Sequence, residues 1–124
     1  MVREWYEYSN AARTLFEAQP LKVMDVGCGA GGFSAGLEST GSFKSTWGID
    51  IDGDTAHAYE RNFPGATAFA MANGVEAYAR AVIENLNKLN ENVENKPVFI
   101  ETLLGEKQIP AVGQVDCILI ATPW

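Results

Sequence analysis

The glycine-rich segment MDVGCGAGGFS, residues 24–34, has the composition of a ligand-binding turn. It contains four glycines within six positions: Gly27, Gly29, Gly31 and Gly32. Glycine lets the backbone approach a ligand closely and take conformations that other residues avoid. The free N–H groups of a helix that follows such a turn favour a carboxylate or a phosphate. We therefore expect this turn to bind a small molecule.

Two acidic residues border the turn. Asp25 lies two residues before Gly27, and Asp50 lies 18 residues after Gly32, at the end of a second apolar run. An acid at the position of Asp50 accepts hydrogen bonds from ribose hydroxyls, and the G-x-G-x-x-G spacing by itself also suits a nicotinamide or flavin cofactor. Asp25 favours S-adenosyl-L-methionine instead, because an acid there can meet the ammonium group of the methionyl moiety, directly or through water.

Apolar periodicity predicts the elements that must position these residues. Helices are expected over residues 4–18, 33–40, 53–63 and 74–89, and strands over residues 21–26, 45–51, 67–71 and 115–121. This alternation predicts a doubly wound α/β fold with a parallel sheet. Right-handed crossovers place the four strands in the order 3-2-1-4.

The C-terminal segments determine where this sheet ends. Residues 90–114 are polar and rich in Asn, so they predict a surface insertion with one short strand at residues 97–103. Residues 115–121 form a continuous apolar run, which is typical of a strand covered on both faces. In the order 3-2-1-4 this strand is an edge without a following helix. We therefore expect an incomplete half-sheet whose exposed strand 115–121 can pair with a partner chain.

Composition narrows the choice of partners. The formal net charge of −7 argues against this chain gripping a nucleic-acid backbone by itself. Both cysteines are expected to be reduced, with Cys117 as a small core residue. No apolar run reaches the roughly 18–20 residues of a membrane helix, and the N-terminus lacks the pattern of a signal peptide. We expect no membrane or metal partner, and a nuclear or cytoplasmic location.

Four segments together resemble the DNA (cytosine-5) methyltransferases. MDVGCGAGGFSAGLE (residues 24–38) resembles their first motif and WGIDID (residues 47–52) their second. ERNFPG (residues 60–65) resembles the segment that follows, and VDCILIATP (residues 115–123) resembles the strand leading to their catalytic loop. The resemblance implies a Rossmann-like class I methyltransferase fold. Residues 21–124 would form part of its S-adenosylmethionine-binding domain, preceded by an N-terminal amphipathic helix in residues 1–20.

The same resemblance implies roles for single residues. The methionyl end of the cofactor would lie against the glycine turn and the start of the next helix: Gly27, Gly29, Ala30, Gly31, Gly32, Phe33 and Ser34. Asp50 would hold the ribose. Ile51 would lie against the adenine ring, although a core-facing position in the strand is an equal alternative. DNA would be bound only through parts of the domain that this sequence lacks.

Three positions depart from the family pattern. Gly27 occupies a place where the family usually has Phe, and residues 70–74 lack the acid that binds the adenine amino group. Asn73 could substitute for that acid or could cap a helix. Trp124 stands where the family has its nucleophilic cysteine, and Cys117 lies seven residues earlier, inside the strand. The resemblance therefore implies no catalytic residue in this chain, which by itself is expected to be inactive.

Other interpretations remain open. Glu91-Asn92-Val93 matches the family's sixth motif, but it precedes the fourth, so we do not assign it that role. Methyltransferases of exocyclic amines use Asp/Asn-Pro-Pro-aromatic, and residues 121–124 match only the last two of those four positions. A small cofactor-binding or partner-binding module without catalytic activity is a third possibility, and a dinucleotide oxidoreductase is a fourth.

Overall fold

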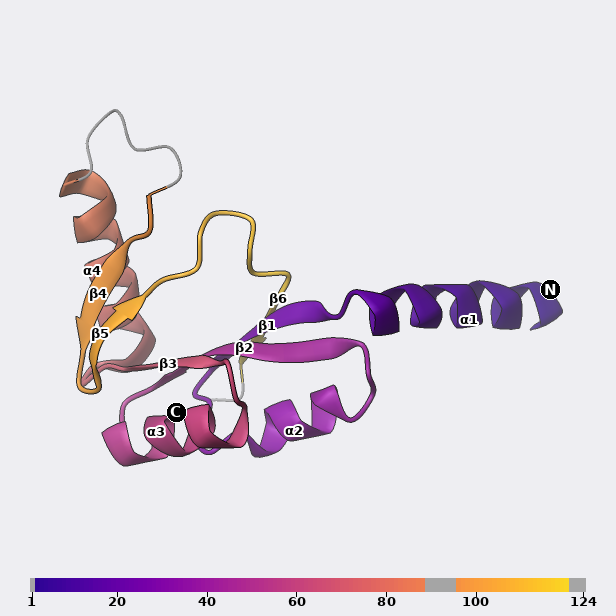
Figure 1. Cartoon of the computed structure of the whole chain (residues 1–124), viewed down its shortest axis with the longest axis horizontal. Coiled ribbons are helices and arrows are strands. Elements are labelled where there is room, and N and C mark those ends of the chain that lie inside the picture. The colour runs from indigo at the N-terminus through magenta and orange to yellow at the C-terminus, as the bar shows by residue number, and fades with distance from the viewer. Residues whose placement is uncertain (1, 89–95, 121–124) are drawn as a thin grey trace.

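The computed structural model describes residues 2–88 and 96–120. The elements are α1 (Val2–Ala18), β1 (Leu21–Val26), α2 (Gly32–Glu38), β2 (Phe43–Asp50), α3 (Gly53–Asn62), β3 (Thr67–Ala70), α4 (Gly74–Lys88), β4 (Phe99–Thr102), β5 (Gly105–Gln108) and β6 (Cys117–Ile120). All eight predicted helices and strands outside the insertion are present, and their ends lie within two residues of the predicted ends. Helix α1 runs away from the sheet at one end of the molecule (Figure 1).

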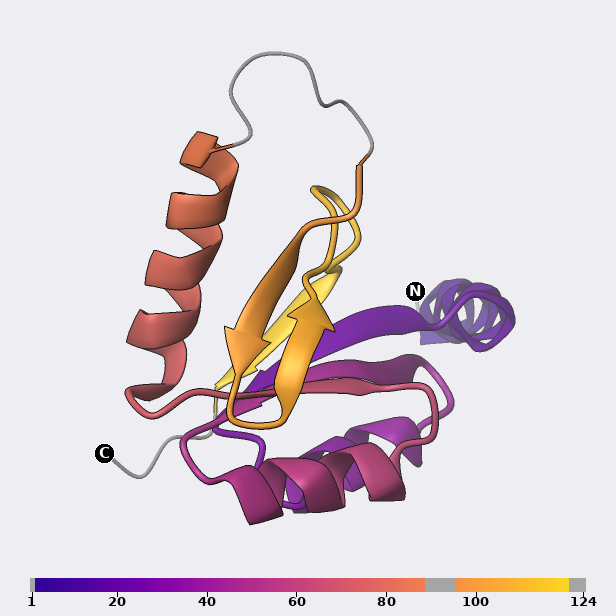
Figure 2. The ribbon, with the colours of Figure 1, turned by 60° about the vertical axis from the view of Figure 1, so that its left-hand side comes forward.

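The main sheet has the strand order β3-β2-β1-β6, with all pairs parallel. This confirms the predicted order 3-2-1-4, with β6 as its fourth strand, and confirms the Rossmann-like α/β half-sheet. Helices α2 and α3 lie on one face of the sheet, and α4 with the β4–β5 hairpin lies on the other (Figure 2). The carboxyl ends of parallel strands share one edge, which is where ligands bind in such sheets.

Each face of the sheet buries its own apolar cluster. The cluster under α4 and the hairpin consists of Met24, Val26, Trp47, Ile49, Phe69, Met71, Ile100 and Ile109. The cluster under α3 consists of Cys28, Ala56, Tyr59, Phe63, Ala68 and Ala70. Gly48 of β2 makes close packing on the second face possible, because a Cβ there would lie 2.8 Å from the Cys28 sulfur and 2.9 Å from the Tyr59 ring.

The short strand predicted at residues 97–103 is present as β4, but the predicted surface position is wrong for the described part of the insertion, residues 96–114. This part forms two antiparallel strands, β4 and β5, and it buries Ile100 and Ile109 in the core. The exposed Phe99 stands next to the buried Ile100 in β4, and β5 contains no apolar residue, so the sequence of the hairpin lacks the alternation typical of a half-buried strand. Residues 89–95 lie outside the described part of the chain.

The hairpin also protects the outer edge of β3. The Leu103 N–H donates to the Ala70 carbonyl oxygen at 2.9 Å, and the Ala68 N–H donates to the Glu60 carboxylate at 2.9 Å. Lys107 of β5 donates to the same Glu60 oxygen at 2.7 Å. Two of the backbone groups that an edge strand usually exposes, the Ala68 N–H and the Ala70 carbonyl, are thus paired at β3.

The prediction that strand 115–121 is covered on both faces is also wrong. Ile118 and Ile120 remain 60% and 67% exposed. Their partners in β1 are Met24 and Val26, whose side chains join the cluster under α4 and the hairpin. Ile118 and Ile120 therefore extend the same face, but the described elements cover β3, β2 and β1 more fully than β6. Cys117 is half-buried and does not belong to either buried cluster.

Candidate functional site

The glycine turn connects β1 to α2 at the carboxyl edge of the sheet. The N–H groups of Gly27 and Cys28 both donate to the Ile49 carbonyl oxygen, at 2.8 and 3.0 Å. Gly27, Gly29 and Gly31 have φ values of 78°, 54° and 98°, in the left-handed region that favours glycine. The turn is therefore held against the end of β2 along a path that non-glycine residues would strain.

Asp50 ties the end of β2 to this turn. One carboxylate oxygen accepts the Gly29 N–H at 2.9 Å, and the other accepts the Asp52 N–H at 3.1 Å. Each carboxylate oxygen can accept a second hydrogen bond. The side chain is only partly buried, so Asp50 keeps the capacity to bind ribose hydroxyls while it also orients the turn.

Asp25 and Ser34 form a buried polar pair beneath the turn. Their side chains are 1% and 0% exposed, and the Ser34 hydroxyl donates to Asp25 Oδ2 at 2.6 Å. Burial raises the pKa of Asp25; the Ser34 hydrogen bond lowers the pKa and the nearby Asp50 carboxylate raises it. The other oxygen, Oδ1, has no hydrogen-bond partner among the described residues. A buried acceptor without a partner is costly, and an ammonium group would supply the missing donor.

The burial of Asp25 also constrains how a ligand reaches it. Less than 1 Å² of Oδ1 is accessible to solvent, so a direct ion pair requires the turn to shift, whereas a water-mediated contact requires a smaller opening. Ser34 is equally buried. The structure therefore places Ser34 beneath Asp25, where it can act through that carboxylate, and does not place it on the open surface of the turn.

The end of α3 supports the turn from the other side. The Asn62 side-chain amide donates to the Ala30 carbonyl oxygen at 2.7 Å. A Cβ on Gly31 would lie 2.1 Å from Cε2 of Phe63, so this position excludes every other residue unless the ring moves. Sequence reasoning did not identify Asn62 or Phe63 as site residues. The signal was present, because both lie in the segment ERNFPG that resembles the family.

The remaining predicted residues line the open side of the same edge. A Cβ on Gly29 or Gly32 would have no neighbour within 4 Å, so space adjoins the backbone at both positions. Phe33 and Ile51 are exposed, which rules out the core-facing alternative for Ile51. The predicted residues from Gly27 to Phe33 thus meet Asp50 and Ile51 at one edge, and this donor set and open backbone fit an adenosyl amino acid.

Several other candidates are placed less favourably. Asn73 is exposed in the turn before α4, and its side chain makes no hydrogen bond to the described residues, which argues against a capping role. Burial raises the pKa of the Cys28 thiol, so it is not an activated nucleophile. Thr122-Pro123-Trp124 and Glu91-Asn92-Val93 lie outside the described residues.

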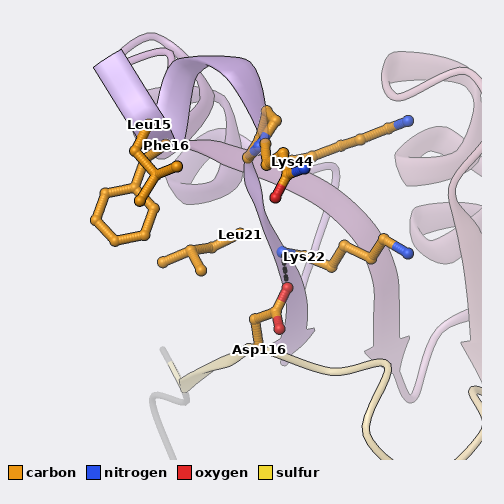
Figure 3. A pocket seen from close by; sticks show the side chains of 8 residues that line it. Leu15, Phe16, Leu21, Lys22, Lys44 and Asp116 are labelled. Carbon is orange, nitrogen blue, oxygen red and sulfur yellow. Dashed lines mark hydrogen bonds between the residues drawn. The ribbon is translucent and has the colours of Figure 1, made fainter. Parts of the chain in front are cut away.

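A separate hollow of about 560 Å³ lies at the opposite, amino-terminal edge of the sheet, where α1 joins β1 (Figure 3). Its lining residues are Leu15, Phe16, Gln19, Pro20, Leu21, Lys22, Lys44 and Asp116. Asp116 accepts the backbone N–H of Lys22 at 2.8 Å there. No predicted site residue contributes to this hollow. Within residues 2–88 and 96–120, no helix is long and apolar enough to cross a membrane, and no cluster of three or more metal-ligating side chains occurs.

Comparison with known proteins identifies relatives of this chain. Residues 21–95 match the model of a family described as C-5 cytosine-specific DNA methylase. DNA (cytosine-5)-methyltransferases 4 and 2 of Arabidopsis thaliana are 32% and 30% identical over alignments of 104 and 102 residues, and these alignments cover 81% and 79% of this chain. A third relative, DNA (cytosine-5)-methyltransferase PliMCI of Paracentrotus lividus, is 42% identical over 50 residues, 40% of this chain and 3% of that protein. The matched part of the chain spans about 7% of the length of each Arabidopsis relative.

Proposed function

Because this chain belongs to the C-5 cytosine-specific DNA methylase family, we propose that its glycine turn binds S-adenosyl-L-methionine for methyl transfer to cytosine in DNA. The observation that carries this proposal is the hydrogen bond between Asp50 and the Gly29 N–H. It joins the carboxylate suited to ribose and the backbone suited to the methionyl group into one unit. Bound S-adenosylmethionine would supply an electrophilic methyl group.

The chain's own residues bind and orient that ligand. The open backbone at Gly29 and Gly32 accommodates the methionyl end. The unpartnered oxygen of Asp25 receives its ammonium group through a water molecule, or directly once the turn has shifted. Asp50 accepts the ribose hydroxyls, and Ile51 contacts the adenine ring. Ser34 orients Asp25 through its hydroxyl, while Asn62 holds the turn through the Ala30 carbonyl.

Methyl transfer to cytosine needs further residues. Attack on the pyrimidine requires a thiolate nucleophile. We propose that this chain lacks it, because Trp124 occupies the position of the nucleophilic cysteine. The net charge of −7 is also unsuited to holding DNA. We therefore expect the purified chain, given labelled S-adenosylmethionine and DNA, to leave no label on cytosine. Label at cytosine C5 would contradict this expectation.

The open edge of β6 is the place where we propose that a further strand of the catalytic domain pairs. Asp116 donates its N–H to the Lys22 carbonyl, so by strand alternation the backbone groups of Cys117 and Leu119 point away from β1. Among the described residues no strand pairs with this side of β6. We expect the chain alone to self-associate with rising concentration in sedimentation experiments. A folded monomer throughout would count against this pairing.

Calorimetric titration with S-adenosylhomocysteine tests the cofactor site. We expect binding weaker than micromolar for the chain and no measurable binding for Asp50→Ala, which loses both the ribose contact and the Gly29 anchor. Asp54→Ala is the matched control, because Asp54 is a neighbouring exposed acid in the first turn of α3. Submicromolar affinity would show that the pocket is complete, and unchanged affinity in Asp50→Ala would show that the ribose assignment is wrong.

A further inference from the structure

The tip of the β4–β5 hairpin reaches the carboxyl edge of the sheet. The Leu103 N–H donates to the carbonyl oxygen of Ala70, the last residue of β3. A Cβ on Gly53, the first residue of α3, would lie 3.9 Å from Leu103 Cβ and 3.9 Å from Leu104 Cδ2. The tip therefore packs between the end of β3 and the start of α3. This place is close to the end of β2, against which the glycine turn is held.

The two leucines at this tip differ in burial. Leu104 is partly buried and packs against the apolar cluster under α3. Leu103 remains 61% exposed, although its backbone N–H is bonded to the Ala70 carbonyl oxygen. Core packing thus explains why an apolar residue stands at Leu104. It does not explain Leu103, whose side chain remains available at the carboxyl edge of the sheet.

Ile51 is the second large apolar side chain exposed at this place. It is 49% exposed and lies two residues before Gly53, beside which Leu103 packs. Segments that are about fifty residues apart in the sequence therefore bring two uncovered apolar side chains to the same part of the edge. An aromatic ring would bury both and gain the free energy of removing apolar surface from water.

We propose that Leu103 forms, together with Ile51, the apolar contact surface for the adenine ring of the cofactor, an inference that rests on the proposed function. Residues 70–74 contain no acid, and the Ala70 carbonyl already accepts the Leu103 N–H. The base is therefore recognised here mainly through its apolar faces. The hairpin thereby joins the ligand site, although it lies outside the four segments that resemble the family.

Binding of S-adenosylhomocysteine to Leu103→Ser tests this assignment. We expect about tenfold weaker binding, because a polar side chain replaces an apolar one against the ring. Leu86→Ser is the matched control: it makes the same exchange at an exposed leucine in the last turns of α4 and is expected to leave the affinity unchanged. Leu103→Met, which keeps an apolar surface, is expected to bind within about threefold of the unmodified chain.

The outcomes separate this inference from the proposed function. If the unmodified chain does not bind S-adenosylhomocysteine at all, the proposed function fails. If it binds and Leu103→Ser binds equally well, only the role of Leu103 is overturned. If Leu103→Ser unfolds, the contact can be tested on the unmodified chain. The measurement is the nuclear Overhauser effect between the Leu103 methyl protons and the adenine H2 and H8 protons. Its presence supports the contact, and its absence in a saturated complex overturns it.

Discussion

The Asn62 side-chain amide donates a hydrogen bond of 2.7 Å to the Ala30 carbonyl oxygen, so the last residue of α3 holds the glycine turn that precedes α2. This bond joins two segments 32 residues apart. Together with the contact between Gly31 and Phe63, it makes the C-terminal end of α3 a support for the ligand site. The segment ERNFPG has a clear physical task in this arrangement, since it determines where the turn lies.

Asn62→Ala should weaken both the fold and the ligand site. Loss of this hydrogen bond is expected to reduce the free energy of unfolding by about 0.5–1.5 kcal/mol, and the loosened turn should bind S-adenosylhomocysteine less tightly. Urea unfolding and calorimetry measure the two effects. Asn85→Ala removes a similar amide-to-carbonyl bond within α4 and should leave the affinity unchanged. Equal affinities for the two variants would show that Asn62 does not support the site.

Gly31→Ala and Gly32→Ala should separate folding from binding. At Gly31 the methyl group would meet the Phe63 ring and the φ of 98° would be strained, so we expect a loss of about 1–3 kcal/mol in unfolding free energy. Gly32 begins α2 and has open space beside it, so Gly32→Ala should keep the stability and weaken S-adenosylhomocysteine binding. Stable Gly31→Ala protein, or full binding by Gly32→Ala, would contradict these assignments.

Asp25 should give the protein a specific pH dependence. Its pKa is raised in the folded state, so the folded chain holds this proton more tightly than the unfolded chain does. The free energy of unfolding should therefore fall as pH rises from the ordinary carboxyl pKa through the raised one. S-adenosylhomocysteine affinity should rise over the same range, because the ammonium group pairs with the ionised form. Urea unfolding and calorimetry between pH 4 and pH 8 should show both trends in the difference between the unmodified chain and Asp25→Asn, because the other titrating groups are common to the two proteins.

The Glu60–Lys107 pair should contribute measurably to stability. The two side chains are only 20% and 22% exposed, and the same Glu60 oxygen accepts the Ala68 N–H. Glu60→Ala should cost about 1–3 kcal/mol, because it leaves a backbone donor and an ammonium group without their partner. Arg80→Ala breaks the well-exposed Glu76–Arg80 pair and should cost less than about 1 kcal/mol. Thermal unfolding that ranks the two variants in the opposite order would contradict this interpretation.

The sequence by itself determined the order of the elements, the parallel sheet and the position of the ligand turn. Apolar periods of two and 3.6 residues are local properties, so α3 and β1 could be predicted almost to the residue. The glycines and the two aspartates are likewise adjacent or nearly adjacent to strand ends, and the topology of a parallel sheet brings such ends together. The resemblance to the family rested on the same short segments.

Tertiary structure alone decided the roles that depend on contacts between distant segments. Ile118 and Leu103 are as apolar as buried residues, but their exposure depends on whether another element covers them. Asp25 looked like an accessible ligand for an ammonium group, and only the tertiary structure showed that it is buried against Ser34. The support of the glycine turn by Asn62 could not be predicted either. This hydrogen bond depends on where two distant segments of the chain meet in space, and local sequence patterns contain no information about that.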